Sequence, residues 1–209
     1  MNAPRYSLIL ALLLSSSILV GSQELTPLKQ LELGQSVTQM LTGYATAKPV
    51  LEKRDRRSLV DGVFAVPITN NLYWSGAIVG IIGDHVASIA YIQSANFERA
   101  FSNAPIILRQ LISLQGTNYI RAVARQHSKT GKVESPVLIW EKPDRVLAYS
   151  FMPLELYKEG EPFVCQLTLF PPGKKREEFF EIATLPDADK VRVFRSVDEI
   201  LQNEAAPRP

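Results

Sequence analysis

The chain of 209 residues has a single cysteine, Cys165, and two histidines, His85 and His127. One thiol excludes an intramolecular disulfide, and there is no Asn-x-Ser/Thr site for N-glycosylation. The histidines show neither His-x-His nor Glu-x-x-His spacing, so no zinc motif and no cofactor is expected. Lys and Arg total 23 against 21 Asp and Glu. This near-balance argues against a nucleic-acid binder, because such proteins neutralise phosphates with an excess of basic side chains.

Motifs for nucleophilic catalysis are also missing. There is no Gly-x-Ser-x-Gly sequence, which presents the nucleophilic serine of many hydrolases. Cys165 shares one face of an alternating strand with Leu167 and Leu169, which predicts a buried, inert thiol. The sequence therefore predicts no catalytic, cofactor-binding or metal-binding residues. The alternative hypothesis is a secreted or periplasmic hydrolase that uses Cys165 or a site at Asp84 and His85.

Beyond the N-terminus, uninterrupted apolar runs are scarce. Arg5, an apolar core over residues 8–20 and small residues up to 22 form the pattern of a secretory signal peptide, residues 1–22, cleaved before Gln23. We expect an exported mature chain, periplasmic or extracellular, without a transmembrane span. An uncleaved membrane anchor is the alternative, although the run is short for one. Because secreted eukaryotic domains of this size often contain disulfides, the single cysteine favours the bacterial cell envelope as the location of the mature chain.

Residues 23–57 are expected to form an N-terminal amphipathic helix over 27–46 followed by a charged linker. Apolar residues recur there at spacings of three and four, as on one face of a helix. The linker contains the run EKRDRR at 52–57. Its basic pairs also resemble the processing sites of secreted precursors. The alternative is therefore a eukaryotic secreted protein that is processed after Arg57.

Residues 72–93 form the most apolar stretch after the N-terminus, and Gly83, Asp84 and His85 lie at its centre. In a membrane helix, Asp84 would lie at mid-bilayer, which costs about 2.5–3.5 kcal/mol. Gly83-Asp84 instead suits the two central positions of a type II′ turn, since glycine accepts a positive φ at the first of them. We predict a β-hairpin, with a buried helix or a membrane span as alternatives.

The two-residue turn also predicts the register of the hairpin. Ile82 would face His85, and Ile78 would face Ile89. Both faces are mostly apolar, which indicates a central strand pair covered on both sides. Glycines in a strand allow close approach of another element. We expect the glycine-bearing face to hold an apolar helix over 105–115.

The rest of the chain is rich in predicted strands. The expected fold class is α+β: a predominantly antiparallel sheet with a covering helix, plus the N-terminal amphipathic helix, in a domain over 58–204 with a disordered tail over 205–209. The predicted strands are 63–68, 119–126, 137–141, 146–151, 163–170, 179–184 and 191–194, and the predicted helices are 97–101, 105–115 and a short one at 200–201.

Since no catalytic motif is found, we expect an exported, non-catalytic envelope or secreted protein that binds another protein, for example within an assembly or transport apparatus. One candidate contact is the N-terminal amphipathic helix with its charged linker. Another is the pair Phe179-Phe180 beside the basic residues 174–176, because exposed aromatic side chains are common in protein interfaces.

Overall fold

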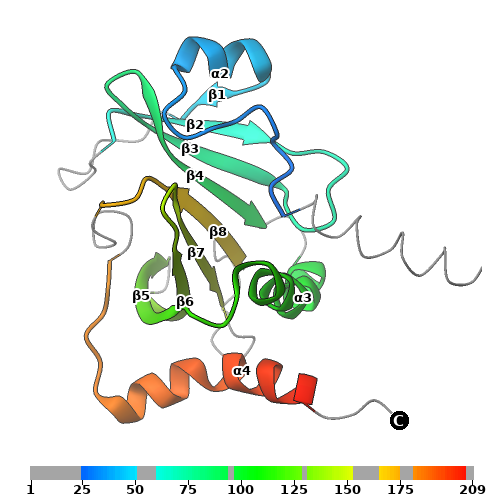
Figure 1. The fold of residues 1–209 in the computed structure, drawn as a ribbon, viewed down its shortest axis with the longest axis vertical. Coiled ribbons are helices and arrows are strands. Elements are labelled where there is room, and N and C mark those ends of the chain that lie inside the picture. Colours follow the sequence, from blue (N-terminus) through cyan, green and yellow to red (C-terminus); the bar gives the residue numbers. More distant parts are fainter. Residues whose placement is uncertain are drawn as a thin grey trace, which may run out of the picture.

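The computed structural model describes residues 25–50, 60–93, 97–128, 131–152, 165–174 and 181–205. In these residues the fold is mixed α+β, with one antiparallel eight-stranded sheet and three helices (Figure 1). The strand order is β1-β2-β3-β4-β8-β7-β6-β5. The strands are β1 (Lys48–Pro49), β2 (Gly62–Pro67), β3 (Gly76–Ile82), β4 (His85–Gln93), β5 (Ile120–Ser128), β6 (Gly131–Glu141), β7 (Val146–Phe151) and β8 (Cys165–Phe170). The helices are α2 (Val37–Gly43), α3 (Phe97–Gln115) and α4 (Asp187–Ala205).

The predicted hairpin is confirmed as β3 and β4, and Ile82 pairs with His85. The predicted turn type is wrong. Both central residues have positive φ, +55° at Gly83 and +65° at Asp84, which defines a type I′ turn. Asp tolerates this left-handed conformation better than most residues. In the described part of the chain, no helix is long and apolar enough to cross a membrane.

The predicted register fails a few residues beyond the turn. A β-bulge shifts the pairing between Gly80 and Ile81. Ile78 consequently pairs with Ala90, so the predicted pairing with Ile89 is wrong. A shift of one residue exchanges the two faces of a strand. The larger of the two buried hydrophobic clusters, which includes residues of α3 and α4, is called the main core. The bulge puts Ile89 into this main core, whereas a regular ladder would turn it to the other face of the sheet.

The prediction that a helix covers the glycine-bearing face is also wrong. A Cβ atom on Gly80 would lie 2.5 Å from Ser88 Oγ and 2.9 Å from Val60 Cγ1, so neighbouring side chains already fill this space. Helix α3 packs on the opposite face of the sheet. There the Tyr149 hydroxyl donates a hydrogen bond to the carbonyl oxygen of Ala104 in α3, at 3.0 Å.

The predicted N-terminal helix over 27–46 is not confirmed, because α2 covers only Val37–Gly43. Before α2, the chain runs beside β4, where Gly34 N donates to Val86 O and Val86 N donates to Gln35 O. These bonds hold the backbone in a form that a continuous helix could not adopt. The segment belongs to the main core, to which it contributes Leu25, Leu28, Leu31 and Met40.

The C-terminal part differs most from the sequence prediction. The predicted strand over 191–194 is wrong, because these residues lie in helix α4. The predicted helix at 200–201 is present, but it is part of this longer helix, which already begins at Asp187. Helix α4 starts directly after Pro186, and its buried residues Val193 and Val197 lie one helical turn apart. Helix α3 likewise continues through Pro105, where the sequence predicted a break.

Candidate binding cleft

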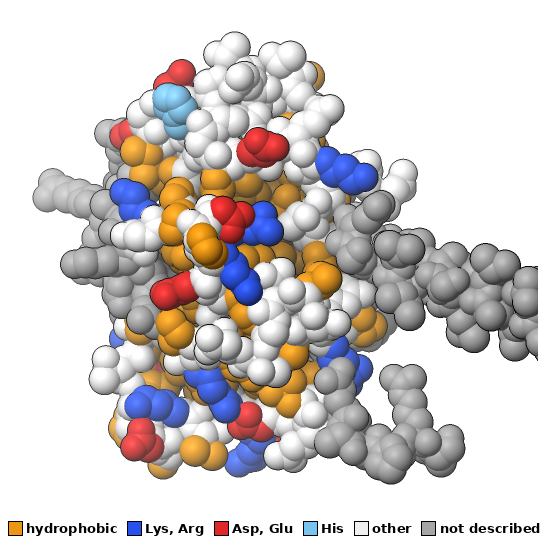
Figure 2. All heavy atoms as spheres, in the orientation of Figure 1, with side chains coloured by type: hydrophobic (Ala, Val, Ile, Leu, Met, Phe, Trp, Pro, Cys, Tyr) orange, Lys and Arg blue, Asp and Glu red, His pale blue; other side chains and the backbone are white. Residues whose placement is uncertain are grey.

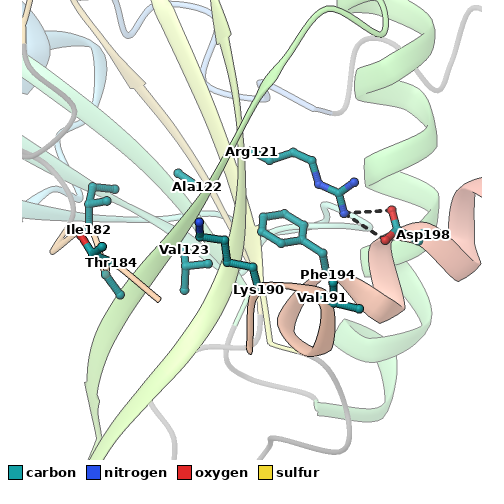
Figure 3. A pocket seen from close by; sticks show the side chains of 10 residues that line it. Arg121, Ala122, Val123, Ile182, Thr184, Lys190, Val191, Phe194 and Asp198 are labelled. Carbon is teal, nitrogen blue, oxygen red and sulfur yellow. Dashed lines mark hydrogen bonds and ion pairs between the residues drawn. The ribbon is translucent and has the colours of Figure 1, made fainter. Parts of the chain in front are cut away.

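A cleft of about 470 Å³ lies between the outer edge of β5, residues 182–184 and α4 (Figure 3). Its volume falls within the range of about 300–1,000 Å³ that is common for ligand sites. In Figure 1, α4 lies at the opposite end of the molecule from α2. The cleft is lined by Arg121, Ala122, Val123, Ile182, Ala183, Thr184, Lys190, Val191, Phe194 and Asp198.

The interior of the cleft is mainly apolar. Val123 and Phe194 are buried members of the main core that also line the cleft. Val191 lines it from α4 with 67% of its surface exposed, more than any other large hydrophobic residue in the described part. Figure 2 shows hydrophobic, basic and acidic side chains interspersed over the end of the molecule formed by α4. A ligand here would find an apolar surface with charged side chains around it.

An ion pair closes one side of the cleft. Arg121 Nη2 lies 2.9 Å from Asp198 Oδ1 and 3.0 Å from Asp198 Oδ2. The guanidinium carbon of Arg121 also lies 4.2 Å from the centroid of the Phe194 ring, in cation–π geometry. Both charged side chains are partly exposed, so the ion pair adds only about 0–1 kcal/mol to stability. Its main consequence is to fix Arg121 between the sheet and α4.

A second cation, Lys190, lines the cleft near the start of α4. Its Nζ atom lies 2.9 Å from Asp187 Oδ1. The hydrogen bond from Lys190, and then its positive charge, lower the pKa of the Asp187 carboxyl. Asp187 is almost fully exposed, so water screens this ion pair. Lys190 can therefore exchange Asp187 for a carboxylate of a ligand at little cost.

The chain itself shows how the outer edge of β5 binds an extended segment. Ile182 forms an isolated antiparallel bridge with Ala124. Two backbone hydrogen bonds flank this bridge, from Arg125 N to Glu181 O at 2.7 Å and from Ala183 N to Val123 O at 2.8 Å. After Ala183 the chain turns away toward α4. The cleft opens where this segment leaves β5.

The structure does not bring the candidate catalytic residues together. Cys165 is buried, as predicted, and burial raises the pKa of its thiol to about 12, although a hydrogen bond with Tyr149 opposes this shift. Cys165 pairs with Gln93 at the far end of β4 from His85, roughly 25 Å away at about 3.3 Å per residue. His85 is exposed at the hairpin tip, and its Nδ1 lies 2.8 Å from Gly83 O. None of these residues lines the cleft.

Several predicted features lie outside the described residues. They are the signal peptide with its cleavage site at Gln23, the charged linker with Arg57, and Phe179-Phe180 with the basic residues 175 and 176. The side chain of His127 is likewise not described. Within the described part, no group of three or more His, Cys, Asp or Glu side chains lies close enough together to hold a metal ion.

The sequence prediction missed every residue of the cleft. The strand predicted over 191–194 includes Val191 and Phe194, although Val193, Phe194 and Val197 have the spacing of a helix. Comparison with protein-family models, with curated proteins and with solved structures finds no match. The function is therefore argued from the residues of this chain.

Proposed function

We propose that this protein is an exported, non-catalytic binding protein that holds a segment of a partner protein in the cleft between β5 and α4. The observation that supports this most directly is an apolar cleft beside a sheet edge, with the highly exposed Val191 in its lining. Sheet edges bind extended segments of other proteins through the backbone, and adjoining pockets select their side chains. Export is supported by the signal-peptide pattern over 1–22.

Site-specific crosslinking tests the binding part of this proposal. A photoreactive amino acid is placed at position 191, and at position 114 as a matched control, in the cells that produce the protein. Val191 and Leu114 are both exposed apolar residues on helices, but only Val191 lines the cleft. We expect a discrete protein adduct from position 191 and none from position 114. Equal adduct patterns at both positions, or none at 191, would contradict the proposal.

N-terminal sequencing of the secreted form tests the export part. A start at Gln23 supports cleavage of a signal peptide alone. A start at Ser58 supports the alternative of a eukaryotic protein processed after Arg57. Retention of Met1 would contradict both versions. A start at Ser58 would also remove Leu25, Leu28, Leu31 and Met40 from the main core, so it should be accompanied by a marked loss of stability.

A further inference from the structure

We infer that the partner segment binds as an added β-strand on the outer edge of β5, with its backbone bonded to Arg121, an apolar side chain against Val191 and an acidic side chain beside Lys190. This inference rests on the proposed function and specifies the chemistry of the partner. The occupant is an extended peptide with alternating acidic and apolar residues.

The pairing of β5 with β6 determines which backbone groups point outward. Val123 pairs with Pro136, which has no N–H group to donate. The Val123 carbonyl bonds instead to Ala183 on the other side, and Arg125 N–H bonds to Glu181 there. Outward-pointing groups recur at every second residue of an antiparallel strand. The N–H and C=O of Arg121 therefore point to the same outer side as those of Val123 and Arg125.

Residues 181–183 occupy only part of this outer edge. They bond to Val123 and Arg125, and among the described residues no backbone group bonds to Arg121 on that side. Arg121 lines the cleft, so an extended peptide in the cleft would meet one donor and one acceptor there. The added strand would continue the line that residues 181–183 begin, so the geometry is one that this edge already accepts.

The side walls of the cleft select the side chains of such a peptide. Successive residues of a strand point to opposite faces of the sheet. Residues that point toward the main-core face would meet the exposed apolar surface of Val191 and, beside it, the small exposed part of Phe194, which requires an apolar side chain. The charged residues in the lining are Arg121, Lys190 and Asp198, two cations and one anion. Asp198 is already paired with Arg121, whereas the ion pair of Lys190 with Asp187 is exposed to water, so Lys190 can exchange Asp187 for a carboxylate of the peptide.

Titration of short peptides into the isotope-labelled full chain tests this mode by NMR. The probe is acetyl-Glu-Val-Glu-Val-Glu-amide, and a version with Lys in place of Glu tests the charge preference. Two further versions carry N-methyl groups on alternate amides, one in each phase. We expect shifts at the amides of Arg121 and Val123, and at least fivefold weaker binding of the Lys version. One methylation phase should weaken binding at least tenfold, and the other should leave it within about threefold.

Variants of the protein test the roles of Val191 and Lys190 in binding the peptide. Val191→Glu should weaken binding of the acidic peptide at least fivefold, while Leu114→Glu should leave it within twofold. Lys190→Glu should reverse the preference toward the Lys peptide. Equal binding of both methylation phases, or shifts confined to other elements, would overturn strand addition. Specific crosslinks at position 191 without peptide binding would overturn this inference alone. Peptide binding in the expected pattern without any crosslink would support the site chemistry and contradict the proposed function.

Discussion

The reactivity of Cys165 gives the sharpest test of whether this chain is a thiol enzyme. The perturbation is addition of a thiol reagent at pH 8, once to the native protein and once to the protein unfolded in urea. Burial raises the pKa of the thiol from its ordinary value of 9.0 to about 12. At pH 8 the thiolate fraction is then about 10⁻⁴ in the native state and about 10⁻¹ in the unfolded state. Labelling of the native protein should thus be slower by about 10³, because the thiolate is the nucleophile.

The position of Cys165 in the sheet slows the reaction further. Only 1% of its surface is exposed, and it lies between Gln93 of β4 and Phe151 of β7 in a continuous antiparallel ladder. A reagent reaches the sulfur only when these strands separate, which requires the sheet to open. The labelling rate should therefore follow the population of the open state and rise steeply through the urea transition.

The assay is direct because the chain has one cysteine, so the whole signal comes from one sulfur. Absorbance of the released chromophore is followed over time at increasing urea concentrations, with unfolding monitored in parallel by tryptophan fluorescence. We expect labelling and unfolding to rise together. Native labelling within tenfold of the unfolded rate would refute this reasoning, and it would restore the hypothesis of a hydrolase that uses Cys165.

Three further predictions concern stability. At pH 9 about half of the unfolded Cys165 thiol is ionised and at pH 10 nearly all of it, while the folded thiol keeps its proton. The free energy of unfolding should therefore fall by about 1.0 kcal/mol between the two pH values, and Cys165→Ala should remove this contribution in urea titrations. Gly80→Ala should cost about 1–3 kcal/mol by overpacking, whereas Gly62→Ala, with no atom within 4 Å of its new Cβ, should show no such cost in the same titration. Trp140→Phe removes the 2.8 Å bond from Trp140 Nε1 to the carbonyl of Gly116, and calorimetry should show a loss of about 1–3 kcal/mol; an unchanged melting temperature would contradict this.

The parts of the fold that could be predicted from the sequence are those determined by local chemistry. The apolar residues over 146–151 predicted β7 with its observed bounds. The hairpin of β3 and β4 follows in the same way from Gly83 and Asp84. Turn residues and period-two patterns act over a few positions, so a single sequence contains the information.

The parts that could not be predicted depend on contacts between distant residues. The bulge in the hairpin is required by neither Gly80 nor Ile81 on its own, since an apolar strand permits either register. The helix over 27–46 is not confirmed over its full length, because Gly34 and Gln35 bond to Val86, a partner far along the chain. Tertiary contacts of this kind override local helix propensity.

The error at α4 had the largest consequence, because it concealed the candidate site. As a strand, residues 191–194 would place Val191 and Val193 on one face. As a helix, they place Val193 in the core, whereas Val191 lies about 200° around the axis from it and stays 67% exposed. A single exposed valine needs no functional explanation. Here it lines an apolar cleft beside the Arg121 backbone, so the same helical phase that buries Phe194 also places Val191 where a partner would touch it. The contrast between Val191→Glu and Leu114→Glu measures whether that placement is used.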